Sequence, residues 1–240
     1  PNGSRVYYLG RSQPPLLAAM MASYFAATGD VAWLQQHIKT LEKELVYWLD
    51  NKKVTVKIKN KKYILLRYLA DSTHSGPRPE SYFEDYQNGQ LLPKEEMRKE
   101  FYTEMKSAAE SGWDFSSRWF VTAGNEILGN LTDVHATRIV PVDLNAIFAG
   151  ALEFAGYFHN ALKDKREAQK WWSLAKYWRN AIDEVMWDPV DGVWYDYDAQ
   201  ARTPRKHFYP SCVTPLWAGA VVKLTAPKYA AKLVKYLLSS

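Results

Sequence analysis

The chain has 240 residues, a formal net charge of +5 and a single cysteine, Cys212. One cysteine excludes a framework of internal disulfides, and no stretch approaches the ~20 consecutive apolar residues that a membrane-spanning helix needs. A chain of this length favours one domain, which buries roughly three quarters of the surface that the unfolded chain exposes.

The excess positive charge is concentrated in one place, because six lysines and no acid lie between Lys52 and Lys62. A local run of this kind is typical of a solvated turn more often than of a nucleic-acid surface. The 10 Trp and 16 Tyr exceed the needs of a core. Since both side chains join a flat apolar face to a polar tip, they favour a carbohydrate or nucleobase surface.

Two helices are predicted at the start of the chain. Two prolines lead into an apolar helix over residues 16–28, which Gly29 ends as a C-cap. Asp30 caps a second helix over residues 31–49, whose apolar side chains recur at helical spacing. The two helices are expected to form a hairpin.

A change to alternating apolar residues between Val54 and Leu66 predicts a small surface β-hairpin that turns at Asn60. Its lysines protect the exposed edge from pairing with other chains. Prolines in the loop over residues 70–82 forbid a regular helix there, and a polar helix is expected over residues 93–109.

The second half of the chain repeats the design of the first. The expected elements are an irregular polar segment over residues 123–138, a helical hairpin over 141–162 and 164–187, a turn and short strand over 188–197, and a last helical pair over 213–224 and 227–238. Successive helical hairpins bury their apolar faces against one another. The sequence therefore predicts an all-α fold with a small β-hairpin insertion.

One carboxylate, Asp114, has an unusual neighbourhood, because it lies between Trp113 and Trp119 and two residues after Gly112. Flat rings suit the faces of a sugar, and an apolar wall raises the pKa of a carboxyl group, which then holds its proton near neutral pH. Gly112 permits a close approach to a ligand or a backbone conformation closed to other residues. The alternative is structural: Asp114 caps a short helix by accepting the N–H of a following serine, and the tryptophans belong to the core.

The segment Arg78-Pro-Glu80 places a cation and an acid on a backbone that the flanking prolines restrict. Arginine forms bidentate hydrogen bonds to paired oxygens, which suits a polyhydroxylated substrate. The alternative is an ion pair between Arg78 and Glu80 that clamps the loop. By themselves, Asn2, Arg11 and Gln13 are equally well explained as turn residues and a surface charge.

Four pieces of the chain, taken in order, closely resemble the trehalases, the inverting glycoside hydrolases that split α,α-trehalose into two glucose molecules. The pieces are residues 1–15, 77–82, 111–119 and 141–145, so the resemblance extends over essentially the whole chain. It implies that Asp114 is the general acid. It also implies that the substrate-binding residues are Asn2, Arg11, Gln13, Arg78, Glu80, Gly112 and Trp113.

The resemblance further implies an (α/α)6 toroid, a ring of helical hairpins whose loops gather over a central pocket, of which this chain would form a partial barrel. The hairpins expected from the sequence are consistent with that fold. The family is generally metal-free, and no cofactor is expected. The five histidines, at positions 37, 74, 135, 159 and 207, share no spacing typical of a zinc site.

Two signature segments of the family are not matched within residues 1–240. An inverting glycosidase needs an acid and a base carboxyl roughly 6.5–9.5 Å apart. The chain matches the acid, whereas the base glutamate is expected after residue 240. We therefore expect the chain to be the central segment of a single catalytic domain, truncated at both ends and inactive by itself.

Two other functions remain open, an (α/α)6 glycosidase of different specificity and a carbohydrate-binding or interaction module without activity. The expected partner is a small disaccharide, trehalose, with no nucleic acid and no membrane span in this segment. Family habit predicts an extracellular or periplasmic protein, and Asn130 begins an N-glycosylation sequon.

Overall fold

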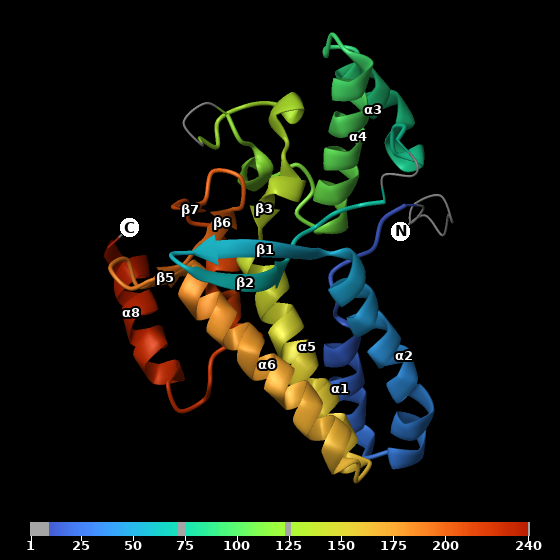
Figure 1. Cartoon of the computed structure of the whole chain (residues 1–240), viewed down its shortest axis with the longest axis vertical. Coiled ribbons are helices and arrows are strands. Elements are labelled where there is room, and N and C mark those ends of the chain that lie inside the picture. Colours follow the sequence, from blue (N-terminus) through green and yellow to red (C-terminus); the bar gives the residue numbers. More distant parts are fainter. Residues whose placement is uncertain (1–9, 72–74, 123–125, 240) are drawn as a thin grey trace. The chain divides into compact units, whose positions relative to one another are not determined.

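The computed structural model describes residues 10–71, 75–122 and 126–239, and it is mostly helical with a few small sheets (Figure 1). The chain divides into two compact units. The α5 unit comprises Pro15–Leu66, Val140–Tyr197 and Arg202–Ser240, and the α4 unit comprises Pro1–Pro14, Arg67–Ile139 and Asp198–Ala201. The predicted predominance of helices is confirmed.

The first helical pair of the α5 unit is formed by α1 (Leu17–Thr28) and α2 (Val31–Asn51). Gly29 adopts a left-handed φ of 64°, and its N–H donates to the Phe25 carbonyl at 2.9 Å. The Asp30 carboxylate accepts the Trp33 N–H at 2.9 Å. Both predicted caps are therefore confirmed, because capping depends on residues that are close in sequence.

The second pair is formed by α5 (Val142–Ala161) and α6 (Lys165–Met186), and Asp164 caps α6 by accepting the Glu167 N–H at 3.1 Å. Helix α5 is buried along almost its whole length and packs against α6, α1 and α2 (Figure 1). It is the centre of this unit. Its apolar composition on all faces matches that position, because a helix that is hydrophobic all round is buried.

The predicted β-hairpin is present as β1 (Lys53–Ile58) and β2 (Lys61–Leu66), which pair antiparallel with Lys53 opposite Leu66. Lys59, with a φ of 53°, and Asn60 make the turn. The other strands are short: β3 (Ile139–Val140), β4 (Trp187–Asp188), β5 (Val193–Trp194), β6 (Asp196–Asp198) and β7 (Thr203–Arg205). Strands β4 and β5 pair antiparallel.

The last predicted helical pair is wrong in its first half. Helix α7 (Thr214–Trp217) has only one turn, whereas α8 (Ala226–Ser239) is present as expected. Gly219 adopts a left-handed φ of 74°, and the Ala220 N–H donates to the Pro215 carbonyl at 3.0 Å. A left-handed glycine after a helix is a common stop signal, and it ends α7 before the apolar residues that follow.

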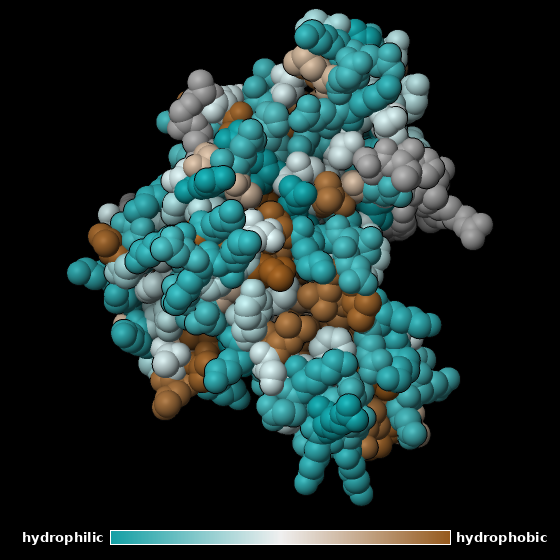
Figure 2. Space-filling view, in the orientation of Figure 1, coloured by the Kyte–Doolittle hydropathy of each residue, from teal (hydrophilic) through white to brown (hydrophobic). Residues whose placement is uncertain are grey.

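Hydrophobic surface remains on the α5 unit where α2 and α6 approach each other, and Figure 2 shows it in brown. The groove there has a volume of about 580 Å³ and is lined in part by Val46, Leu49, Leu174 and Tyr177. These lining side chains are mainly apolar.

The described residues of the α4 unit form α3 (Tyr82–Gly89), α4 (Glu95–Glu110) and several short 3-10 helices. The 3-10 helices are η2 (Pro79–Ser81), η3 (Ser117–Trp119), η5 (Leu131–Asp133) and η6 (Ala136–Arg138). Helix α4 was expected, within two residues at each end. Helix α3 was not, because its eight residues carry few apolar side chains at helical spacing.

A buried amide, Asn145, connects three elements of the α5 unit. Its Oδ1 accepts the Leu66 N–H at 2.8 Å and the Trp178 Nε1–H at 3.1 Å. Its Nδ2 donates to the carbonyls of Leu66 at 2.9 Å and Pro141 at 2.8 Å. All its hydrogen-bonding capacity is used inside the protein, which fixes the end of β2 against α5 and α6.

We expect Asn145→Ala to lower the free energy of unfolding by about 2–5 kcal/mol, because it leaves buried groups of Leu66 and Trp178 without partners. Denaturant unfolding measures the loss. Asn160→Ala is the matched control, since Asn160 is exposed on the same helix, and it should change stability by less than about 0.5 kcal/mol. Equal effects of the two substitutions would contradict the role of Asn145.

Candidate active site

The loop that follows α4 turns sharply around Asp114. Gly112 adopts a φ of 73°, and the Trp113 N–H donates to the Ser111 hydroxyl at 2.9 Å. The Trp113 carbonyl accepts the Ser116 N–H at 3.1 Å, which closes a turn with Asp114 and Phe115 at its centre. Gly112 is therefore explained by its backbone conformation, because a Cβ there would meet no atom within 4 Å.

Phe115 also lies in the left-handed region, with a φ of 48°. This conformation costs an L residue about 1–2 kcal/mol and is unusual for a bulky side chain. Strained backbone of this kind is concentrated at functional sites, where the surrounding structure maintains it.

Asp114 does not cap the helix that follows it. The cap of η3 is Ser116, whose hydroxyl accepts the Arg118 N–H at 3.2 Å. The structural alternative from the sequence is therefore wrong in this respect. The carboxyl group of Asp114 sits on an exposed residue and is available to a ligand.

The pKa of Asp114 is raised above its ordinary value. The main cause is that neighbouring protein atoms displace part of the hydration of the carboxyl group, although the residue keeps an exposed side. The positive charges of Arg11 and Arg78 oppose this shift, and the negative charge of Glu80 supports it. The structure thus brings four of the predicted site residues into one electrostatic cluster.

The two arginines of this cluster are each paired with a carboxylate. Arg11 donates from Nε and Nη2 to Glu80 Oε1 at 3.3 and 3.1 Å. Arg78 donates from Nε to Asp85 Oδ2 at 2.8 Å and from Nη2 to Asp85 Oδ1 at 2.7 Å. The expected alternative of an ion pair between Arg78 and Glu80 is wrong, because Arg78 pairs with Asp85, seven residues later, and Glu80 pairs with Arg11, 69 residues earlier.

These pairs leave specific atoms available for a ligand. Within the described part of the chain, Nη1 of Arg78 and Oε2 of Glu80 have no hydrogen-bond partner. The side chains are held at low exposure, 7% for Arg78 and 10% for Glu80. The result is one donor edge and one acceptor oxygen in fixed positions, which suits the hydroxyl groups of a sugar.

Glu110, the last residue of α4, anchors the segment that carries Arg11. It is fully buried, and its Oε1 accepts the N–H of Ser12 at 2.9 Å and the Ser12 hydroxyl at 2.5 Å. Its Oε2 accepts the Leu69 N–H at 3.0 Å. Arg11 Nη1 donates to the Ala109 carbonyl at 3.1 Å, so the end of α4 holds Arg11 directly as well.

The two tryptophans beside Asp114 have different environments. Trp119 is fully buried and donates from Nε1 to the Trp113 carbonyl at 2.9 Å. The Arg118 guanidinium lies near both rings, 4.7 Å from the centre of Trp119 and 5.2 Å from that of Trp113. Trp119 therefore belongs to the core, and only the half-buried Trp113 keeps surface for a ligand.

The structure leaves the predicted substrate-binding roles of Gln13 and Asn2 untested. Gln13 is exposed and its side chain forms no hydrogen bond with the described residues. Asn2 lies outside the described residues. Their roles stay predictions.

Three residues of the cluster were missed by sequence reasoning: Asp85, Glu110 and Phe115. Asp85 and Glu110 contact partners that the sequence does not identify. The one signal for Glu110 was its position directly before the matched piece 111–119, which contains Asp114. Nothing in the sequence indicates the left-handed backbone of Phe115.

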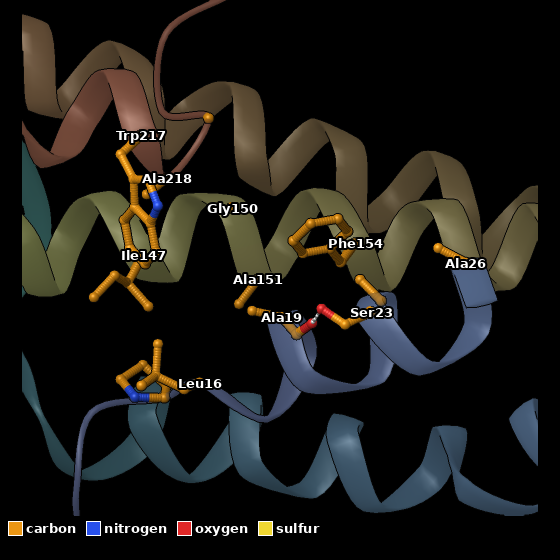
Figure 3. A pocket seen from close by; sticks show the side chains of 13 residues that line it. Leu16, Ala19, Ser23, Ala26, Ile147, Gly150, Ala151, Phe154, Trp217 and Ala218 are labelled. Carbon is orange, nitrogen blue, oxygen red and sulfur yellow. Dashed lines mark hydrogen bonds between the residues drawn. The ribbon is translucent and has the colours of Figure 1, made fainter.

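The α5 unit contains a second hollow, an apolar groove of about 450 Å³ between α1 and α5 that Figure 3 shows closely. Leu16, Ile147, Phe154 and Trp217 point into it, and small residues line the rest. It has no titratable side chain, so it offers no acid–base chemistry. Among the described residues, no group of three or more His, Cys, Asp or Glu side chains is placed to hold a metal ion.

We expect Glu110→Ala to loosen the segment around Arg11, because it removes the acceptor of the Ser12 and Leu69 N–H groups at about 1–3 kcal/mol for each buried group. Amide hydrogen exchange at Ser12 and Leu69 should become faster. Glu96→Ala, at an exposed position of the same helix, is the control and should leave both rates unchanged. Unchanged exchange in Glu110→Ala would show that Glu110 is no anchor.

Comparison with known proteins identifies relatives over the whole chain. A family model described as Trehalase matches residues 1–240. The trehalase of Bombyx mori is 48% identical over 240 residues, which are 100% of this chain and 41% of the relative. The human trehalase is 43% identical over 237 residues, 99% of this chain and 39% of the relative. The chain thus spans about two fifths of the length of these curated relatives.

Solved structures show the same fold at lower identity. The neutral trehalase of Saccharomyces cerevisiae superposes with a TM-score of 0.71 at 21% identity, covering 97% of this chain and 45% of that chain. A mannosylglycerate hydrolase of Thermus thermophilus in complex with glucose gives a TM-score of 0.55 at 16% identity, covering 94% of this chain and 51% of that one. At such identities the likeness concerns the fold alone.

Proposed function

The chain belongs to the trehalase family, and on this premise we propose that the whole protein hydrolyses α,α-trehalose to two glucose molecules with Asp114 as its general acid. The observation that carries the proposal is the cluster around Asp114. An exposed carboxyl group with a raised pKa lies in the field of Arg11, Arg78 and Glu80.

The chemistry requires a group that holds a proton until the glycosidic bond breaks. The protonated carboxyl of Asp114 donates its proton to the oxygen between the two glucose units, which lets one glucose depart. Partial burial raises the pKa of Asp114 and so favours its protonated form. The charges of Arg11 and Arg78 limit this rise, so that the carboxyl group can still ionise when it gives up its proton.

The remaining residues of the cluster would bind the sugar. Arg78 Nη1 donates to hydroxyl oxygens and Glu80 Oε2 accepts from hydroxyl groups, while their other atoms keep them in place. Trp113 offers a half-buried ring to the apolar face of a glucose unit. By the family resemblance, Asn2 and Gln13 add further hydrogen bonds, and Gly112 shapes the loop.

Inversion needs a second carboxyl that activates water on the opposite side of the bond, roughly 6.5–9.5 Å from the acid. By the family resemblance, we infer that the base glutamate is not among residues 1–240. We propose that another part of the whole protein supplies it, so that residues 1–240 by themselves do not turn over trehalose.

The (α/α)6 toroid is part of the same proposal. The pairs α1–α2 and α5–α6 are the units from which such a ring is built. Helix α1 supports further packing, because it is apolar on all sides yet buries only Ala18 and Met21, and Met20 is 66% exposed. In a closed ring, more helices would cover α1 and the groove of Figure 3.

The proposed partner is the disaccharide itself. Within the described ranges, none of the helices combines the length and the apolar character that crossing a bilayer requires. We propose a location outside the cytoplasm. One relative, from Citrobacter koseri, is named a periplasmic trehalase and is 35% identical over 248 aligned residues.

In the full-length protein, Asp114→Asn should lower kcat for trehalose at least about 10²-fold with a much smaller change in KM, because it keeps the shape and removes the proton. Activity of the parent should fall as pH rises through the raised pKa of Asp114, since only the protonated form donates. Melting temperature on the same preparation is the control. A stable and fully active variant would refute Asp114 as the acid.

Arg78→Lys should not preserve activity, because an ammonium group cannot pair with both oxygens of Asp85 and also present a planar edge to the sugar. We expect kcat/KM for trehalose to fall at least about 10-fold, as for the loss of one charge-assisted hydrogen bond. Assays on maltose and sucrose with the parent test specificity. Turnover near that of the parent would count against the role of Arg78.

A further inference from the structure

Two observations meet at Phe115. Its backbone is left-handed at the third position of the turn that Trp113 and Ser116 close, a position where glycine or asparagine is the common choice. Its ring lies 4.6 Å from the carbon at the centre of the Arg78 guanidinium. A large side chain is thus kept at a place where the backbone disfavours one.

The contacts of Arg78 show what the ring adds. Asp85 holds the guanidinium along one edge through Nε and Nη2, and it also accepts the backbone N–H of Arg78 at 3.0 Å. Because Asp85 contacts only one edge of the guanidinium, the guanidinium plane can still rotate about that edge. The face of an aromatic ring removes this freedom, because a guanidinium stacks on it through cation–π attraction.

We propose that Phe115 is a positioning residue, held in a left-handed backbone so that its ring fixes the plane of the Arg78 guanidinium beside Asp114. The consequence of this contact, that Arg78 Nη1 points correctly at the sugar, rests on the proposed function. The contact itself does not depend on that function.

One tight turn carries both Asp114 and Phe115. Asp114 and Phe115 are adjacent in one tight turn, so their side chains leave it in fixed relative directions. The Trp113 carbonyl holds the turn twice, by accepting the Ser116 N–H at 3.1 Å and the Trp119 Nε1–H at 2.9 Å. The same backbone therefore sets the acid and the platform of its neighbouring arginine.

The test uses substitutions of Phe115 in the full-length protein. Phe115→Leu keeps an apolar side chain and removes the ring, and kcat/KM for trehalose should fall about 2- to 30-fold, the range that one cation–π contact contributes. Phe115→Tyr keeps the ring and should retain the activity of the parent. Phe25→Leu is the matched control, because Phe25 is also half-buried and its ring pairs with Tyr157 and Phe158 of the α5 unit, and it should leave kcat/KM unchanged.

A stability comparison separates backbone strain from the role of the ring. Phe115→Gly should melt at a higher temperature than Phe115→Ala, since only glycine accepts the left-handed backbone without cost, and both should lose as much activity as Phe115→Leu. If the role of Phe115 were only structural, Phe115→Leu would lower the melting temperature but would have the same kcat/KM for trehalose as Phe115→Tyr. That result would overturn the proposal.

A double-mutant cycle tests the contact without any assay of activity. Phe115→Leu and Arg78→Met should be non-additive, so that the unfolding equilibrium constant of the double variant differs from the product of the single effects by about 2- to 30-fold. Additive effects would overturn the proposal. If the parent does not hydrolyse trehalose, the proposed function fails, and this cycle alone decides whether Phe115 positions Arg78.

Discussion

The need to pair buried guanidinium groups determines the geometry of the candidate site. Taking an arginine out of water is costly unless carboxylates and carbonyls replace the lost hydration. Arg11 meets this need with Glu80 and the Ala109 carbonyl, and Arg78 meets it with both oxygens of Asp85. The Arg11–Glu80 pair joins residues that are far apart in the sequence, and the Arg78–Asp85 pair joins a loop residue to helix α3. The pairs therefore also fix the loops that carry the arginines.

Two nearby carboxylates show how environment divides roles between chemically similar groups. Glu110 is fully buried, and backbone N–H groups of Ser12 and Leu69 occupy its oxygens, so it serves as an anchor. Asp114, four residues later, keeps an exposed side and has a raised pKa, which suits a proton donor. The sharp turn with left-handed Gly112 and Phe115 separates the two environments.

The sequence predicted those features that depend on neighbours in the chain. The caps at Gly29 and Asp30 and the β-hairpin at Asn60 follow from local rules, and the structure contains them. Contacts between distant residues were beyond local rules, as the pairing of Arg11 with Glu80 and the burial of Glu110 illustrate. The short α7 was mispredicted because apolar residues continue past a glycine whose left-handed φ stops the helix. The family resemblance supplied the candidate residues, and the structure added the partners that hold Arg11, Arg78 and Glu80 in place.

If Asp114 is the general acid, it must hold a proton under conditions in which an ordinary aspartate does not. Carbon-13 NMR of the Asp114 carboxyl during a pH titration of the full-length protein measures this directly, with the signal assigned by its loss in Asp114→Asn. We expect a midpoint above the ordinary pKa of an aspartate, because burial outweighs the charges of Arg11 and Arg78. A midpoint at or below the ordinary value would contradict it, since the two arginines would then dominate and leave Asp114 without a proton to donate.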